Sequence, residues 1–196
     1  MAEDKRQALL RGAVQAVARN GMKDVSTRSI SGAAGINDAY IYRYFGDKED
    51  LMFQAFRQEN ERFASHVIRH LAEIQLQMDV LPFRDRFEYV FHSAWRYLLD
   101  TPDVCRFFMY YYHSPSFETY AREDFHHQMD ALAEMLLHLF GTMENARHCL
   151  YKLYILLLSF AVLVMNGQNP DNEETEARAF RTVYSAICIQ IEPGVA

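Results

Sequence analysis

The chain has 196 residues, and half of them are hydrophobic, enough to form a sizeable core in one or two compact units. The formal net charge of −6 argues against binding to nucleic acid through overall positive charge. The charge is uneven, because residues 1–50 hold eight Lys and Arg against seven Asp and Glu, whereas the rest hold twelve against nineteen. Any contact of residues 1–50 with phosphates therefore depends on the local face that they present.

The three cysteines, Cys105, Cys149 and Cys188, are widely spaced, and no CxxC pair occurs. This spacing excludes a disulfide framework and a zinc site, and it is typical of buried free thiols in a reducing cytoplasm. A reactive sensing thiol is the alternative for any one of them. No apolar run follows the basic residues at the N-terminus, so we expect no secretory signal and a cytoplasmic protein.

Apolar residues at helical spacing predict a first helix over residues 3–19. Asn20 and Gly21 form a good stop, since glycine can take the left-handed conformation that ends many helices. Ser26 or Thr27 can then cap the next helix.

The stretch 26–51 has the spacing of two short helices that pack across a tight turn and lead into a third helix. Gly35 lies where the turn needs a permissive backbone. The polar and aromatic side chains of residues 37–43 would face outward. This pattern predicts a helix-turn-helix, whose second helix enters a DNA major groove. The residues expected to form its small core are Ile30, Ala34, Ile36, Ile41 and Phe45.

Four short motifs in this stretch agree in spacing: Ile30, then Ala34-Gly35-Ile36, then Tyr42-x-Tyr44-Phe45, then Lys48-Glu49-x-Leu51. Together they resemble the DNA-binding signature of TetR-type transcriptional regulators. The resemblance implies a DNA-binding domain over residues 1–48 and an effector-binding and dimerisation domain over residues 49–196. It also implies repression more often than activation.

Two kinds of DNA contact are expected. Tyr42, Tyr44 and Lys48 are placed to bind phosphates, since phenol hydroxyls and ammonium groups bind phosphate oxygens without reading the sequence. Thr27 and Arg28, at the start of the helix before the turn, are expected to make similar contacts. The side chains expected to approach base edges are Asn37, Ala39, Tyr40 and Arg43.

Asp38 departs from the signature, because a carboxylate that faces phosphates is repelled. It can accept a hydrogen bond from a cytosine amino group, or it can cap the recognition helix, and we favour capping slightly. Asp47 is expected to cap the helix that begins near Lys48.

The rest of the chain has no persistent strand alternation, so an all-α fold of about nine helices is expected. A long helix over residues 48–75 would link the DNA-binding head to the second unit. Pro and Gly residues bound the later elements. The further helices are expected over residues 82–100, 102–112, 114–140, 144–165 and 173–191, with a frayed tail at 192–196.

Residues 153–165 form a continuous apolar run that is too short for a membrane span. A buried core helix is one interpretation, but such a helix near the end of the chain favours a subunit interface. The resemblance likewise implies a homodimer through the last two helices, and no membrane partner. The interface residues expected are Tyr154, Leu157, Leu158, Ala161, Val162, Met165, Phe180, Val183, Tyr184 and Ile187.

The middle helices contain more aromatic residues than a small core needs, and Tyr and Trp side chains suit a cavity wall because they have polar ends. The resemblance implies a small-molecule effector in this part, which we expect to be apolar or aromatic. His92, His113, Cys105 and Met109 can add polar contacts. The residues predicted to bind the effector are Phe63, His66, Phe91, Trp95, Phe107, Phe108, Tyr111, Tyr112, Phe125, Met129 and Tyr151.

Two alternatives compete with a ligand-responsive regulator of a palindromic DNA site. Glu123-x-x-His126 is half of a di-iron motif, but such sites need two of these pairs, so neither an enzyme nor a bound metal or cofactor is expected. No nucleophile elbow, phosphate-binding loop or HExxH motif is present. The second alternative, a helical interaction module, explains the acidic balance but not the four agreeing motifs.

Overall fold

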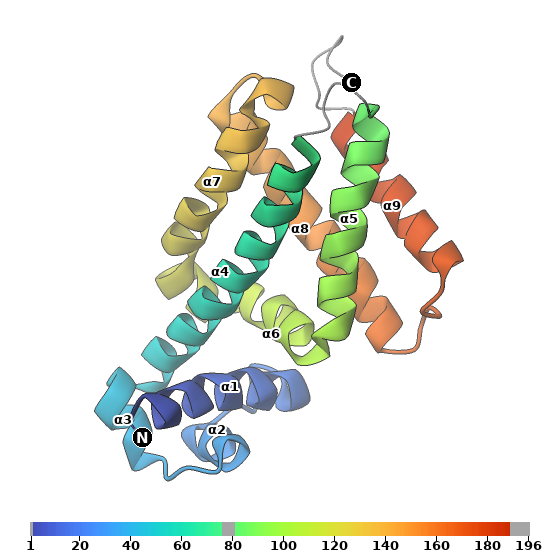
Figure 1. Ribbon diagram of the computed structural model, residues 1–196. Coiled ribbons are helices and arrows are strands. Elements are labelled where there is room, and N and C mark those ends of the chain that lie inside the picture. Colours follow the sequence, from blue (N-terminus) through green and yellow to red (C-terminus); the bar gives the residue numbers. More distant parts are fainter. Residues whose placement is uncertain (1, 76–80, 189–196) are drawn as a thin grey trace. The chain divides into compact units, whose positions relative to one another are not determined.

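The computed structural model describes residues 2–75 and 81–188, which contain nine α-helices, one π-helical turn and no strand (Figure 1). The predicted all-α fold is confirmed. The elements are α1 (Ala2–Asn20), α2 (Thr27–Ala34), α3 (Ala39–Phe45), α4 (Lys48–Gln75), α5 (Phe83–Asp100), α6 (Pro102–Tyr112), η1 (Phe117–Ala121), α7 (Arg122–Phe140), α8 (Met143–Met165) and α9 (Glu173–Cys188).

One predicted helix is divided, because residues 114–140 form the π-helical turn η1 followed by α7. Ser114 makes the turn before η1: its hydroxyl donates to the Tyr111 carbonyl at 2.6 Å and accepts from the Phe117 N–H at 3.2 Å. Phe117, Ala121 and Phe125 are all buried. Residues four apart lie on nearly the same side of a helix, so these three side chains face the core of unit 1 together. The predicted end of the last helix at Ile191 and the tail 192–196 lie outside the described residues.

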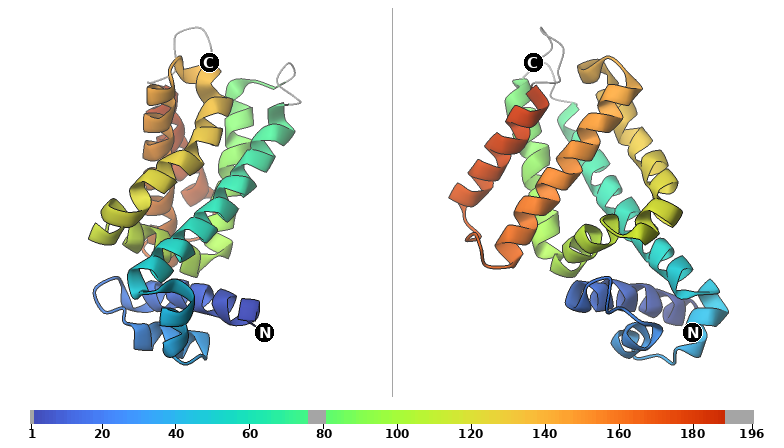
Figure 2. Two further views of the ribbon diagram at one scale, coloured as in Figure 1. Left: turned by 90° about the vertical axis from the view of Figure 1, so that its left-hand side faces the viewer. Right: turned by 180° about the vertical axis from the view of Figure 1, so that it is seen from behind.

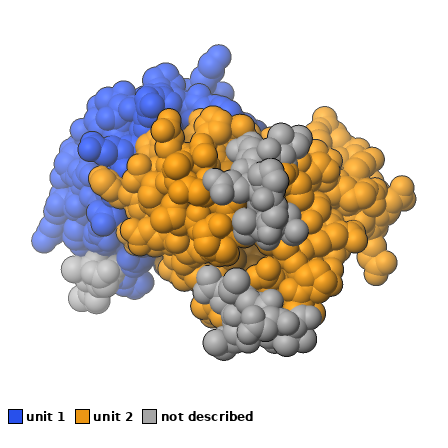
Figure 3. All heavy atoms as spheres, turned by 90° about the horizontal axis from the view of Figure 1, so that it is seen from above, with its two compact units in different colours: residues 1–60, 101–125 blue, residues 61–100, 126–196 orange. Residues whose placement is uncertain are grey.

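The chain groups into two compact units (Figure 3). Unit 1 consists of Met1–Asn60 and Thr101–Phe125, and unit 2 of Glu61–Asp100 and His126–Ala196. The continuous helix α4 therefore supplies its first half to unit 1 and its second half to unit 2.

In unit 1, α1 packs against α2, α3 and α6. Gly12 of α1 lies at the closest approach, because a Cβ atom added there would lie 2.8 Å from both the Ala34 Cβ and the Ile30 carbonyl oxygen. The absence of a side chain at this position is what lets α1 and α2 come so close.

A second part of the unit 1 core is aromatic and centres on Phe56 of α4. The Phe56 ring lies 5.1 Å from the Tyr111 ring and 5.4 Å from the Phe117 ring, between centroids. The same ring also contacts Phe107, Phe108 and Phe125. This cluster joins α4 to α6, η1 and the start of α7 within unit 1.

Tyr111 is fully buried in the aromatic cluster, and its hydroxyl has no hydrogen-bond partner among the described residues. Burial raises the pKa of Tyr111. Because a buried hydroxyl without a partner costs about 1–3 kcal/mol, we expect Tyr111→Phe to raise the free energy of unfolding by about 1 kcal/mol. Urea denaturation measures this change, with Tyr110→Phe at the exposed neighbouring position as the control. A loss of stability in Tyr111→Phe would show that the hydroxyl has a partner in solution.

In unit 2, α5, α8 and α9 pack against one another and lie side by side in both views of Figure 2. Arg147 of α8 binds Asp130 of α7 with two hydrogen bonds of 2.6 and 3.0 Å, and this pairing lowers the pKa of Asp130. His92 of α5 bonds to Glu176 of α9. The core of unit 2 includes Trp95 and Leu158, both fully buried.

Candidate functional site

The helix-turn-helix of unit 1 is held by local hydrogen bonds. Ser26 caps α2: its hydroxyl accepts from the Ser29 N–H, and the Ser29 hydroxyl accepts from the Ser26 N–H, which together form a capping box. Gly35 ends α2 with φ of 64°, and the Ile36 N–H donates to the Ser31 carbonyl at 3.0 Å. This is a Schellman motif, which needs the left-handed conformation that glycine takes without strain.

The slight preference for Asp38 as a capping residue was wrong. Asp38 makes no side-chain cap, and the Asn37 side-chain oxygen instead accepts from the Ala39 N–H at 2.9 Å. An acceptor two residues before the N–H forms an Asx turn, which leaves Asp38 exposed. Asp47 caps α4 as expected, since its carboxylate accepts from the Asp50 N–H at 2.8 Å.

The small core of the helix-turn-helix consists of the buried Ile30, Ile41 and Phe45, with Ala34 and Ile36 half-buried. The opposite side of α3 is exposed, and Tyr42 has 58% of its surface accessible. Thr27 and Tyr44 are half-buried. Four more of the predicted DNA-contact residues are exposed, namely Arg28, Asn37, Ala39 and Arg43.

Tyr40 is held by Lys5 of α1, a residue that the sequence did not single out. The Lys5 ammonium donates to the Tyr40 hydroxyl at 3.0 Å and lies 4.2 Å from the ring centroid. This hydrogen bond and the charge of Lys5 lower the pKa of Tyr40. Tyr40 also stacks on Tyr44, with the ring centroids 5.8 Å apart. Because Lys5 and Tyr40 are 35 positions apart, no local pattern in the sequence could have indicated the pair.

Lys48 lies at the start of α4 and is half-buried. Its ammonium donates to the Val25 carbonyl at 3.5 Å and pairs with Glu49 at 3.3 Å. The side chain is therefore held near the loop before α2.

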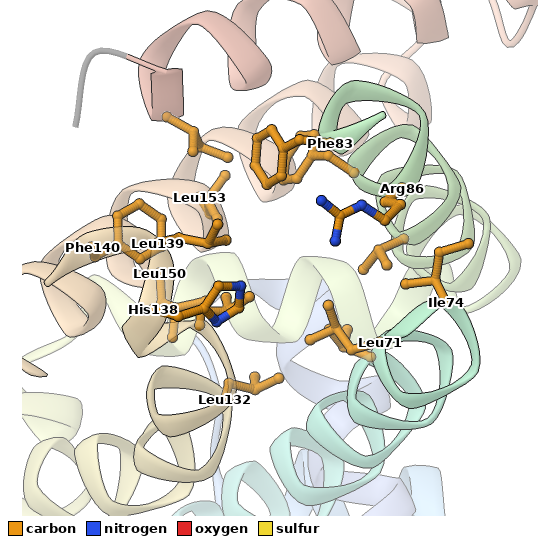
Figure 4. A pocket seen from close by; sticks show the side chains of 15 residues that line it. Leu71, Ile74, Phe83, Arg86, Leu132, His138, Leu139, Phe140, Leu150 and Leu153 are labelled. Atoms are coloured by element: carbon orange, nitrogen blue, oxygen red, sulfur yellow. The ribbon is translucent and has the colours of Figure 1, made fainter. Parts of the chain in front are cut away.

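Unit 2 contains two adjoining cavities of about 110 and about 90 Å³, whose walls share residues of α4, α5, α7 and α8. Figure 4 shows the larger one. Its wall combines leucine, isoleucine, valine and phenylalanine side chains with two polar ones, Arg86 and His138. Such apolar cavities with few polar groups are typical of small-molecule sites.

The predicted effector residues are divided between the two units. Phe63, Phe91 and Met129 line the smaller cavity. Trp95 stacks on Phe91, with the ring centroids 6.0 Å apart. Tyr151 is exposed. Five of the predicted residues belong to unit 1, where they pack in or beside the cluster around Phe56: Phe107, Phe108, Tyr111, Tyr112 and Phe125.

His66, another predicted effector residue, bonds to α5 within unit 2. Its Nε2 lies 2.7 Å from the Ser93 hydroxyl oxygen and 3.2 Å from the Ser93 carbonyl oxygen. Burial lowers the pKa of His66, against the opposing effect of the Ser93 carbonyl.

Sequence reasoning missed most of the cavity wall, because it followed aromatic residues and the wall is largely aliphatic. The leucines of α7 and α8 recur every three or four positions, but this spacing marks a buried face and not a hollow. The missed residues include Leu71, Ile74, Arg86, Leu136, His138, Leu150 and Leu153.

Two of the three cysteines, Cys105 and Cys149, are buried. Burial raises the pKa of Cys105 to about 12 and that of Cys149 to about 11, which disfavours the reactive thiolate. Cys188 is half-buried. No group of three or more His, Cys, Asp or Glu side chains within residues 2–75 and 81–188 is placed to hold a metal ion.

The helix α8 is longer than the apolar run seen in the sequence. By length and composition the whole of α8 could cross a membrane. The prediction that the apolar segment is too short for a span considered only residues 153–165. One such helix is weak evidence, because core helices of soluble proteins pass the same test. Only 33% of the apolar window of α8 is buried within the chain.

The choice of interface residues on α8 and α9 needs correction. Tyr154, Leu158 and Ala161 of α8 are buried within the single chain, as are Leu157, Phe180, Val183 and Ile187. These side chains pack between helices of unit 2, so they cannot form an outer face. The apolar residues of α8 that remain partly accessible include Ile155, Leu156, Phe160, Val162, Leu163 and Met165.

Comparison with known proteins adds relatives of two kinds. A curated relative, the HTH-type transcriptional regulator BetI of Stenotrophomonas maltophilia (strain R551-3), is 32% identical over 69 residues. That alignment spans 35% of this chain and only 35% of BetI. A TetR family transcription regulator from Marinobacter aquaeolei VT8 superimposes with a TM-score of 0.67 and 19% identity, covering 94% of this chain and 95% of that one.

A second solved structure, the TetR-like transcriptional regulator LfrR from Mycobacterium smegmatis in complex with proflavine, gives a TM-score of 0.63 at 16% identity. It covers 96% of this chain and 98% of its own length. At these identities the two structures establish that the fold is shared along nearly the whole chain.

Residues 9–55 match the family model described as bacterial regulatory proteins, tetR family. This span contains most of α1, the helix-turn-helix and the start of α4. A helix-turn-helix with an exposed face on its second helix is the DNA-binding element of transcription regulators of this kind. Residues 9–55 therefore resemble the DNA-binding segment of the tetR family, and the chain shares its fold with a solved TetR family regulator.

Proposed function

We propose that the protein is a ligand-responsive repressor that binds a palindromic operator as a homodimer and leaves it when a small effector occupies unit 2. The observation that carries this proposal is the exposed, hydrogen-bonded recognition face of α2 and α3 on a chain that also has apolar cavities. The localisation proposed for such a regulator is the cytoplasm.

The DNA contacts follow from the exposed face of the helix-turn-helix. Tyr42 and Arg28 lie on the surface, where a phenol hydroxyl and a guanidinium can bind phosphates. Arg43 and Asn37 can approach base edges in the major groove. Tyr40, Ala39, Tyr44, Thr27 and Lys48 complete the predicted contact set, with Tyr40 oriented by Lys5.

The dimer is supported by the outer face of α8, since an apolar surface of this kind needs a cover. A two-fold symmetric pair of subunits presents two recognition helices to two half-sites of a palindrome. Such half-sites lie about 34–36 Å apart, so the dimer must hold its two heads at that spacing.

The effector response is supported by the cavities of unit 2 and by the continuity of α4. The LfrR structure holds proflavine, which is an aromatic molecule. Val67 and Leu71 of α4 line the larger cavity, while Lys48 and Leu51 of the same helix belong to unit 1. A ligand that favours one position of α4 would shift the population of head spacings, provided that its affinity differs between the two states.

The experiment that tests this proposal selects bound duplexes from random oligonucleotides with purified protein. We expect a palindrome with half-sites about one helical turn apart. An unrelated set of duplexes without symmetry would contradict a dimeric repressor.

Lys48→Ala is expected to weaken binding to all duplexes by a similar factor, because a phosphate contact carries no sequence information. The slope of log affinity against log salt should become shallower by about 0.9, the value for one lost phosphate contact. Fluorescence anisotropy at several salt concentrations measures both quantities. Arg122→Ala, which removes an exposed charge on α7, is the control. An unchanged slope in Lys48→Ala would remove this residue from the DNA contacts.

A further inference from the structure

The wall of the larger cavity in unit 2 includes two polar side chains among apolar ones. Arg86 comes from α5 and His138 from the end of α7, and Figure 4 shows both side chains directed into the cavity between leucine side chains. All the other lining residues are aliphatic or phenylalanine. A guanidinium at the wall of such a cavity is costly unless an anion neutralises it.

Within the described residues, Arg86 has no such anion. Arg86 is half-buried as a residue, its Nε is buried without a hydrogen-bond partner among the described residues, and its guanidinium carbon lies 5.9 Å from the centroid of the Phe83 ring. Two other arginines of unit 2 behave differently. Arg96 pairs with Asp100 and Asp171, and Arg147 pairs with Asp130. Because a guanidinium stays protonated at any physiological pH, Arg86 carries its charge into the cavity.

We infer that the cavity binds an amphipathic carboxylate, whose anionic head pairs with Arg86 and whose tail enters the adjoining cavity. This inference rests on the effector site proposed above and names the chemical class of its ligand. The planar fork of a guanidinium matches a carboxylate with two parallel hydrogen bonds. His138 is the second polar side chain of the cavity wall and lies across the cavity from Arg86.

The dimensions of the two cavities favour a slender tail. Their volumes are about 110 and about 90 Å³, and they share Val67, Phe87, Val90, Leu132, Leu150 and Leu153 in their walls. An apolar cavity of about 150 Å³ takes one benzene ring, so this space fits a linear alkyl chain or a single ring. The smaller cavity has neither an arginine nor a histidine in its wall, so it suits the apolar end of the ligand.

Trp95 makes the binding measurable without a label. It is the single tryptophan of the chain, and it stacks on Phe91, which lines the smaller cavity. The protein is titrated at pH 7.5 with each member of two matched pairs of ligands while the Trp95 fluorescence is recorded. The pairs are decanoate with 1-decanol, and 3-phenylpropionate with 3-phenylpropanol. At this pH both acids are ionised, so each pair differs in the charged head and keeps the tail.

We expect at least one carboxylate to bind the wild-type protein about tenfold or more tightly than its alcohol, as a charge-assisted hydrogen-bonded pair does. Arg86→Gln should lower the affinity for the carboxylate by about tenfold and change the affinity for the alcohol by less than about twofold. Arg84→Gln, two positions earlier on α5 and outside the cavity wall, should change neither.

The inference is overturned if neither carboxylate binds the wild-type protein more tightly than its alcohol, a comparison that needs no variant. It is also overturned if a folded Arg86→Gln binds the carboxylate as tightly as the wild type does. Release of the selected duplex is measured separately by anisotropy. Binding of decanoate through Arg86 without release would support the ligand class and refute ligand-responsive repression. Release of the duplex by another compound, with no binding of either carboxylate, would support ligand-responsive repression and refute the carboxylate as ligand.

Discussion

Replacing Gly12 by alanine is expected to destabilise unit 1 by about 1–3 kcal/mol and to abolish most operator binding. The added Cβ would lie 2.8 Å from the Ile30 carbonyl oxygen and 3.0 Å from the Ala34 nitrogen. These are backbone atoms of α2, which cannot move aside without shifting the whole helix. The intrinsic preference of alanine for helices contributes only about 1 kcal/mol in the other direction. The recognition helix would therefore lose the support of α1.

Gly32→Ala is the matched control for this prediction. Gly32 also lies in a helix, α2, but a Cβ atom there would meet nothing within 4 Å. The substitution should stabilise the protein by up to about 1 kcal/mol through helix propensity alone. Urea denaturation followed by circular dichroism compares the two variants with the wild type. Equal stability of Gly12→Ala and Gly32→Ala would mean that α1 and α2 are less closely packed than described.

The second large effect is expected from Leu163→Glu on the outer face of α8. Ile155, Ser159 and Leu163 recur every four residues, on the side of the helix away from the buried Leu158 and Ala161. In a two-fold symmetric contact the same residue comes from both subunits, so the substitution would place like charges near each other in an apolar interface. The dimer should dissociate. Operator affinity should then fall by about 100-fold or more, because each head would bind its half-site separately.

Ala131→Glu provides the control for Leu163→Glu, since it adds the same charge at an exposed position of α7. Light scattering coupled to size exclusion measures the subunit count, and anisotropy with the selected duplex measures affinity. Circular dichroism checks that both variants fold. If Leu163→Glu stays dimeric and binds with unchanged affinity, the interface lies elsewhere than on α8.

The limits of most helices could be predicted from the sequence because they are set locally. Gly21, Gly35 and Gly141 take positive φ values just after helices, and Pro102 begins one. Each of these signals depends on one or two residues, so helix ends can be recognised from the sequence without knowledge of the fold. The π turn at Phe117–Ala121 could not be foreseen, since it depends on which side chains the rest of unit 1 buries.

The exposed face of the helix-turn-helix was predictable for a similar reason, because its residues are neighbours along two short helices. Its contacts with DNA stay a prediction. The cavity was not predictable. Phe63 and Phe107 look alike as residues, but the fold places the first at a cavity and the second in a packed cluster. Arg86 follows Arg84 and Asp85 in a charged run that is typical of a solvated surface. Only the turn of α5 directs its side chain into an apolar space.

The composition of unit 1 has a practical consequence for anyone who wishes to transplant its DNA specificity onto another regulator. The helix-turn-helix is supported by α1, and α1 packs in turn on α6, some eighty positions further along the sequence. A chimaera that exchanges only the N-terminal segment would join the donor's α1 to the recipient's α6, with mismatched side chains where the two meet. A graft designed from this structure should carry Met1–Asn60 and Thr101–Phe125 together, as two insertions into one host chain.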